Sequence, residues 1–174
     1  MNSTRWTLAI AAAVALAFFT VLVAIPFMTT TLSDGVQAYS QGDYAKAYKD
    51  LKPMAADGEP TAQYILGEMY RLGQGVKKDE ATAVKWYKKA AEGGSPEGQY
   101  ALGMCYATGV GTEVDMIGAY QWLSLIHISE PSWQNERRSL AVDTRSKLLT
   151  AMDQSDVEKA KALVLSWDKK LGGS

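Results

Sequence analysis

The hydrophobic and small positions that follow residue 60 form a pattern that recurs after 36 residues. In each copy, two segments place apolar and small side chains at helical spacing, with a glycine-containing loop between them. The recurring positions of the first copy are Leu66, Gly67, Tyr70, Gly73, Gly75, Asp79, Ala83 and Trp86. Those of the second copy are Leu102, Gly103, Tyr106, Gly109, Gly111, Asp115, Ala119 and Trp122. A fixed period of this length predicts a stack of helical hairpins.

Each copy is predicted to fold as two helices joined by a short loop. Pro60 suits the first position of a helix, where an N–H would have no partner anyway, and the helix then runs to about Leu72. The loop glycines are expected to supply positive φ angles, and Asp79 is a good N-cap for the second helix. That helix ends at Gly93–Gly94, a common C-terminal cap.

The string Leu66–Asp79, followed by Ala83–Ala91, resembles a Sel-1-like repeat, a relative of the tetratricopeptide repeat. The second copy is similar through Trp122, and an abbreviated copy precedes both, from about Asp34 to Pro60. This resemblance implies an all-α fold, a short α-solenoid of Sel-1-like helical hairpins. It also implies binding of other proteins and does not imply any single reaction.

The chain is predicted to have four parts: an N-terminal signal-anchor or signal peptide over 1–28, a linker over 29–34, repeats over 35–128 and C-terminal capping helices over 132–170. The capping helices run from Asn135 to Met152 and from a capping box at Ser155. The second is expected to turn inward its side chains Val157, Ala160, Leu163, Val164 and Trp167. Such helices cover the stacking face of the last repeat.

The segment Trp6–Met28 is uncharged and almost wholly apolar. At about 1.5 Å per residue it can cross a hydrocarbon core of about 30 Å, and Arg5 favours a cytoplasmic N-terminus. We predict an uncleaved transmembrane anchor, because Leu22–Ala24 matches a cleavage motif poorly, and the alternative is a cleaved signal peptide. The repeats are then expected on the periplasmic side of the inner membrane, or in the periplasm or secreted if cleavage occurs.

The repeat pattern ends after Trp122. The residues Tyr87, Ala90 and Ala91 of the first copy are replaced by Leu123, Ile126 and His127. The string Leu123–Pro131 resembles the conceptual translation of a common sequencing adapter, and our hypothesis is that part of it is an assembly artefact. Resequencing the locus from genomic template tests this hypothesis, and recovery of the same codons would refute it.

The composition offers little for catalysis. The formal net charge of −1 does not indicate a nucleic-acid partner. The only histidine, His127, and the only cysteine, Cys105, cannot make a tetrahedral nitrogen/sulfur metal site or a histidine-based triad. Cys105 is expected to be a small buried thiol. We therefore expect no enzymatic activity, cofactor, metal or small-molecule substrate. The alternative is an envelope hydrolase or β-lactamase-like enzyme, although the relatives considered for that activity are rich in paired cysteines.

A basic run extends over the loop and second helix of the first copy, with Lys77, Lys78, Lys85, Lys88 and Lys89. A solvated helix face is the expected role of these side chains. Contact with anionic lipid headgroups is the alternative, because this repeat follows the predicted membrane segment.

Aromatic residues fall into two sets. Tyr70, Trp86, Tyr106 and Trp122 occupy matching positions and are predicted to lie in the core. A second row lies on the opposite side of the first helix of each copy, and in tetratricopeptide-like stacks this helix lines the concave surface. The resemblance therefore predicts a partner-binding groove lined by Thr61, Tyr64, Glu68, Arg71, Glu97, Tyr100 and Met104.

Exposed aromatic and methionine side chains with a few charges suit peptide recognition. The alternative is that Tyr64 and Tyr100 merely pack against neighbouring helices. We predict a non-catalytic protein–protein interaction scaffold or adaptor in the bacterial cell envelope, which binds a peptide or protein on this surface.

Overall fold

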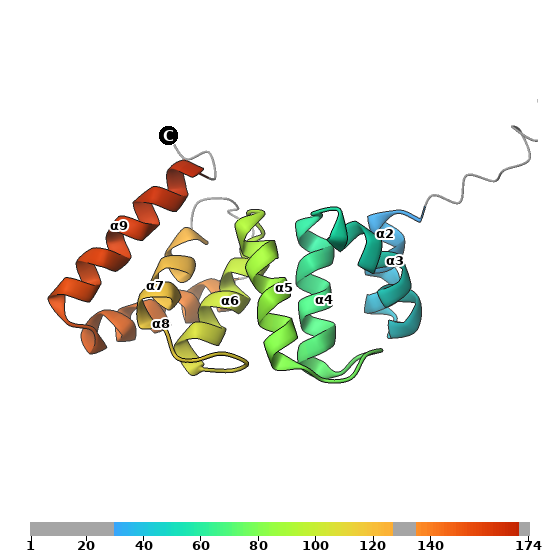
Figure 1. Ribbon diagram of the computed structural model, residues 1–174, viewed down its shortest axis with the longest axis horizontal. Helices are drawn as coiled ribbons and strands as arrows, with labels where there is room; N and C mark the ends of the chain where they lie inside the picture. The colour runs from blue at the N-terminus through green and yellow to red at the C-terminus, as the bar shows by residue number, and fades with distance from the viewer. Residues whose placement is uncertain (1–29, 127–134, 171–174) are drawn as a thin grey trace, which may run out of the picture. The chain divides into compact units, whose positions relative to one another are not determined.

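The computed structural model describes residues 30–126 and 135–170, and within these ranges every regular element is an α-helix (Figure 1). The helices are α2 (Leu32–Ser40), α3 (Tyr44–Ala56), α4 (Pro60–Leu72), α5 (Glu80–Glu92), α6 (Pro96–Thr108), α7 (Met116–Leu125), α8 (Asn135–Ala151) and α9 (Gln154–Lys170). None of these described helices combines the length and the apolar character needed to span a membrane. The predicted anchor Trp6–Met28 lies outside the described residues.

Equivalent aspartates start the second helix of each hairpin. Asp43, Asp79 and Asp115 are the N-caps of α3, α5 and α7, and each accepts a hydrogen bond from the backbone N–H three residues later, at 2.9–3.1 Å. Pro60 and Pro96 open α4 and α6, as predicted. The repeated sequence therefore sets the helix boundaries directly, through the same local capping chemistry in each copy.

Glycines in the loop of each hairpin allow that loop to pack against the preceding hairpin. Gly73 ends α4 at φ 72°, and Gly75 follows at φ 70°, so the predicted positive φ angles are confirmed. A Cβ atom on Gly75 would meet the backbone of Tyr44, the first residue of α3. A Cβ on Gly111 would likewise meet Glu80, the first residue of α5. Each loop thus sits on the start of the previous hairpin's second helix, where a side chain has no space.

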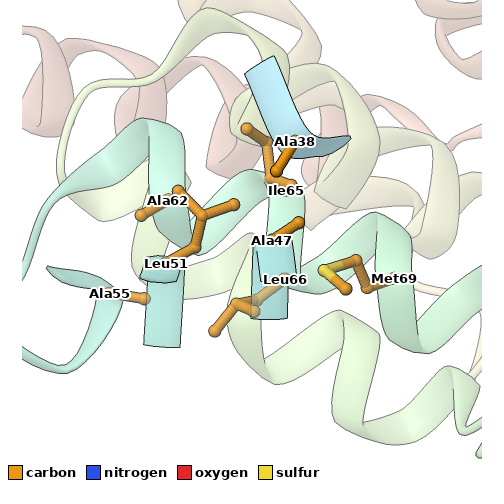
Figure 2. Close-up of a cluster of buried hydrophobic side chains, with 8 residues drawn as sticks. All are labelled: Ala38, Ala47, Leu51, Ala55, Ala62, Ile65, Leu66 and Met69. Atoms are coloured by element: carbon orange, nitrogen blue, oxygen red, sulfur yellow. The ribbon is translucent and has the colours of Figure 1, made fainter. Parts of the chain in front are cut away.

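Each helix from α2 to α7 packs against the next one along the chain (Figure 1). The first core cluster joins α2, α3 and α4, and Figure 2 shows its small and branched side chains meeting between these helices: Ala38, Ala47, Leu51, Ala55, Ala62, Ile65, Leu66 and Met69. Within the next hairpin, α4 crosses α5 closely at Gly67. A Cβ at this position would meet the ring of Tyr87, so only glycine leaves room for the crossing. Gly103 plays the same part on α6, against the side chain of Leu123 on α7.

The aromatic residue predicted for the core of the first repeat was the wrong one of two neighbours. Tyr87 is 0% exposed, whereas Trp86 is only half-buried and carries the Lys89 ammonium 4.4 Å from its ring centre. Helix α5 turns Tyr87 toward Gly67, and Trp86 falls at the edge of the first core cluster. Trp122 is buried as predicted, whereas Tyr70 and Tyr106, also predicted for the core, are half-buried like Trp86 and pack against the edge of a core cluster.

The last two helices cover the final hairpin. Both α8 and α9 pack against α7, and α8 also contacts α6. Ala141 and Leu148 of α8 join a buried cluster with Ala119, Leu123 and Ile126. From α9, Trp167 stacks on Trp122 with ring centres 4.9 Å apart. These contacts bury the apolar surface that the last hairpin would otherwise expose.

Two helix starts differ from the expected positions. Helix α2 begins at Leu32, within the segment expected to be a linker, because Thr31 and Asp34 form a capping box there. At α9 the capping side chain is Asp153, which accepts a 2.8 Å hydrogen bond from the Asp156 N–H, so the predicted capping box at Ser155 is wrong. Helix α9 also leaves Leu163 39% exposed instead of inward-facing.

Candidate binding cavity

Five of the seven predicted groove residues line one cavity of about 300 Å³. They are Tyr64, Glu68, Arg71, Tyr100 and Met104, and the remaining lining residues are Tyr87, Ala101, Cys105, Thr108, Val110 and Arg137. Thr61 is exposed and does not line the cavity. Glu97 is also outside the lining, and its carboxylate accepts a hydrogen bond from the Ser95 hydroxyl at 3.0 Å.

The repeat geometry brings these side chains together. Tyr64 and Glu68 lie one turn apart on α4, and Tyr100 and Met104 occupy the equivalent positions 36 residues later on α6. Residues four apart share a helix face, so the two pairs project from matching faces of the first helices of the two copies. The repeat therefore places the two pairs on matching faces, and the pairs differ in chemistry because α4 carries Glu68 where α6 carries Met104.

Glu68 is the centre of a hydrogen-bonded cluster on the α4 side. Its Oε1 accepts from Arg71 Nε at 3.1 Å, and its Oε2 accepts from Arg71 Nη2 at 2.7 Å. The Tyr87 hydroxyl also donates to Oε1. Burial opposes ionisation of this carboxyl, but the hydrogen bonds from Arg71 and Tyr87 outweigh it and lower the pKa of Glu68. Glu68 is therefore ionised at neutral pH.

Tyr87 is held in place by this cluster and by its packing. Burial and the adjacent Glu68 carboxylate raise the pKa of its hydroxyl far above the usual range, so the hydroxyl remains a donor. Its ring lies 6.1 Å from that of Tyr64, centre to centre, in a tilted arrangement. Tyr87 was not among the predicted site residues, although it directly follows the repeated Trp86 in the sequence.

The third wall comes from α8, which was predicted only as a capping helix. Arg137 Nη1 donates to the Tyr64 hydroxyl at 3.4 Å, and the Thr144 hydroxyl lies 3.9 Å from Met104 Sδ. Tyr100 and Met104 also pack against the buried cluster that includes α8. The groove expected along the first helices is thus closed on its α6 side. Nothing in the sequence marks Arg137, because no repeat position corresponds to it.

A family model matches all the residues that line this cavity except Arg137. The Sel1 repeat model matches residues 60–95 and 96–125. The chain contains two Sel1 repeats. The resemblance inferred from Leu66–Asp79 and Ala83–Ala91 is confirmed. Sel1 repeat proteins are generally scaffolds for protein–protein interaction.

Two solved structures are similar to this chain in fold. One is the crystal structure of c5321, a protective antigen present in uropathogenic Escherichia coli strains and displaying an SLR fold, with 28% identity and a TM-score of 0.69. The match covers 80% of this chain and 29% of that one. The other is a Sel1 repeat protein from Oxalobacter formigenes, with 26% identity, a TM-score of 0.60, and coverage of 81% and 54%. This chain thus spans about a third and about half of their lengths. Comparison with curated proteins gave no match.

Cys105 of the second Sel1 repeat forms part of the cavity wall as a buried thiol, as expected. Burial raises the pKa of the thiol to about 11. An activated nucleophilic cysteine has its pKa shifted in the opposite direction, toward the thiolate. No group of three or more histidine, cysteine, aspartate or glutamate side chains in residues 30–126 and 137–170 could hold a metal ion. His127 lies outside these ranges.

The five lysines of the first Sel1 repeat are all exposed. Lys78 pairs with Glu80 at 2.8 Å, and Lys89 lies over Trp86. Their exposure fits the predicted solvated face, and none of them lines the cavity.

Proposed function

We propose that this protein is a non-catalytic adaptor that binds a peptide segment of a partner protein in the cavity between α4, α6 and α8. The observation that carries this proposal is the convergence of three tyrosines, a methionine and two arginines on one preformed cavity. Tyrosine and arginine are enriched among the residues that dominate binding energy at protein interfaces. A volume of about 300 Å³ is at the low end for ligand pockets, so it suits one or two side chains of a peptide.

The charged groups of the cavity favour binding over chemistry. Glu68 already accepts three hydrogen bonds from Arg71 and Tyr87, and its lowered pKa makes it a poor general acid or base near neutral pH. The buried Cys105 thiol is protonated at that pH. The hydrogen bonds among Glu68, Arg71 and Tyr87 hold these three side chains in fixed orientations, which lowers the cost of ordering the site when a peptide binds.

A blocking substitution tests this proposal. Thr108 is an exposed lining residue at the end of α6, so Thr108→Trp should obstruct the cavity at a stability cost within about 0.5 kcal/mol. Thr61→Trp is the matched control, because Thr61 is exposed on α4 and lies outside the lining. Selection of a displayed random-octapeptide library on the purified full chain should enrich peptides that bind the parent and Thr61→Trp but not Thr108→Trp. Equal enrichment on all three proteins would place binding elsewhere, and hydrolysis of a β-lactam by the purified chain would favour the enzyme alternative.

We also propose that the cell envelope is the location of this adaptor. The support is the apolar segment Trp6–Met28, with Arg5 before it. A reporter active only outside the cytoplasm, fused after Ser174, should give a signal, and membrane fractions should retain the full-length mass. A soluble product shortened at its N-terminus would instead indicate a cleaved signal, and an inactive reporter would place the repeats in the cytoplasm.

A further inference from the structure

The two arginines of the cavity differ in how their charges are compensated. Arg71 makes a two-point contact with Glu68. Arg137 has no carboxylate partner among residues 30–126 and 137–170, and its hydrogen bond there goes to the neutral Tyr64 hydroxyl. At 3.4 Å this bond is longer than the usual 2.7–3.2 Å, so it is weak and readily exchanged for a better acceptor. A guanidinium has five N–H donors, which leaves capacity for a ligand.

Glu68 attracts the Arg137 guanidinium through space but forms no ion pair or hydrogen bond with it. Both of its oxygens accept hydrogen bonds already, from Arg71 on each oxygen and from Tyr87 on Oε1. For the same reason a cationic ligand would have to displace Arg71 from Glu68 to be bound there. Among the described residues, the cavity thus has one carboxylate already bound by Arg71 and Tyr87, and one guanidinium, that of Arg137, with no carboxylate at ion-pair distance.

The remaining lining is neutral and largely apolar. With Arg71 and Arg137 against Glu68, the charged side chains of the lining carry a net charge of +1. Around them stand aromatic rings and the side chains of Ala101, Met104 and Val110. An incoming ligand thus meets one positive group beside apolar surface, and charge complementarity favours a single negative charge next to an apolar side chain.

We propose that the cavity binds a peptide carboxylate through Arg137, with an adjoining apolar side chain against Tyr64, Tyr100 and Met104. The carboxylate comes from an aspartate or glutamate side chain or from a peptide C-terminus, because both offer the same planar pair of oxygens to a guanidinium. This inference rests on the proposed function and names the ligand chemistry of that site. Arg137 belongs to α8, outside the two Sel1 repeats, so this preference is a property of the capping helix.

The test uses two random-octapeptide libraries on the purified full chain, one with blocked peptide ends and one with free C-termini. Arg137→Gln removes the charge and keeps a side chain of similar reach. Arg138→Gln is the matched control, because Arg138 is the exposed neighbour on α8 and does not line the cavity. Enrichment of acidic residues in the blocked library assigns the side-chain source, and enrichment confined to free C-termini assigns the terminal source.

The expected result is a carboxylate preference on the parent and on Arg138→Gln that is lost on Arg137→Gln. An enriched peptide should then lose about tenfold or more in affinity when its carboxylate is replaced by the amide, because hydrogen bonds to charged groups are the stronger class. If peptides are enriched without a carboxylate preference, or if Arg137→Gln retains it, this inference fails while the proposed function stands. If no peptide is enriched above the Thr108→Trp variant, both fail.

Discussion

The two Sel1 repeats share one backbone plan but differ in the side chains that they turn toward the cavity. Where the first repeat has Glu68 and Tyr87, the second has Met104 and Leu123 at the positions 36 residues later. The first pair forms a polar cluster with Arg71. Leu123 instead joins the buried cluster with α8, and Met104 packs against that cluster.

This difference shows what the repeat fixes and what it leaves free. Prolines, capping aspartates and glycines recur, so both hairpins have the same helix starts and turns, and α4 and α6 both have 13 residues. The second helices differ in length, because α5 has 13 residues and α7 has 10. The residues between these recurring positions vary. They decide whether a helix face holds a charged cluster, as in the first repeat, or packs against another helix, as in the second. The second repeat is apolar where α8 docks, and this docking brings Arg137 to Tyr64 of the first repeat. The cavity is thus a product of the difference between the repeats.

The glycine crossings should show the largest contrast. Gly67→Val would push a branched side chain into the ring of Tyr87, which is fully buried and tied to Glu68. The destabilisation should reach about 3 kcal/mol, the upper end for overpacking. Gly103→Val meets the buried side chain of Leu123, an aliphatic side chain without a hydrogen bond to hold it, so a smaller loss of about 1 kcal/mol is expected. Urea unfolding of both variants measures this difference.

An unchanged midpoint for both glycine variants would contradict the close helix crossings. Equal losses of unfolding free energy would show that Tyr87 is no more rigid than Leu123, and that the two hairpins do not differ in how tightly their helices cross.

Tyr87→Phe should have the next largest effect, and the effect should depend on pH. Loss of a hydrogen bond to a charged group costs about 1.5–3 kcal/mol, so about 2 kcal/mol is expected at pH 7. Because the pKa of Glu68 is lowered on folding, its hydrogen bonds stabilise the folded state above the usual carboxyl pKa of about 4.3. That contribution disappears as the pH falls through the lowered folded value, so the cost of the substitution should shrink below about pH 4.

Tyr48→Phe is the control for this pH dependence. It removes a 3.0 Å hydrogen bond between the Tyr48 and Tyr70 hydroxyls, both neutral at acidic pH. Its cost should be about 1 kcal/mol and constant from pH 7 down to about pH 2, well below the carboxyl range. Urea unfolding across this range distinguishes the two variants, and a constant cost for Tyr87→Phe would show that Glu68 is not its partner.

The sequence predicted the parts of this fold that depend on local chemistry. Proline at a first turn, aspartate at an N-cap and glycine at positive φ act within a few residues, so Pro60, Asp79 and Gly73 sufficed to place α4 and α5. The choice between Trp86 and Tyr87 for the core depended on the rotation of α5 against Gly67. A shift of one residue turns a helix by about 100°, and both neighbours are aromatic, so the pattern did not decide between them.

The candidate site was predictable to the extent that it lies on the repeat. Tyr64 and Tyr100 share a helical face by spacing, and their convergence follows from stacking two copies. Arg137 depends on how α8 docks on the last hairpin, which is a tertiary contact without a repeated counterpart. The prediction was a groove along the first helices, because the resemblance to a repeat family describes the repeats alone. It contains no information on α8, which covers one side of that groove.

The smallest effect is expected on the lysine face, which lies on the first repeat but not in its cavity. Lys88 is exposed and does not line the cavity, so Lys88→Cys should change the unfolding free energy by no more than about 0.5 kcal/mol. The introduced thiol is then a reporter, because the native Cys105 is buried and its pKa is raised to about 11. On the full chain reconstituted into vesicles, a solvated face predicts the same maleimide labelling rate with neutral and with anionic lipid. Protection that appears only with anionic lipid, and that added salt removes, would instead assign the lysines to a membrane contact. The two repeats would then differ in their partners as well as in the residues that they contribute to the cavity. Lipid would contact α5 of the first repeat, and the peptide would bind in the cavity that both repeats line.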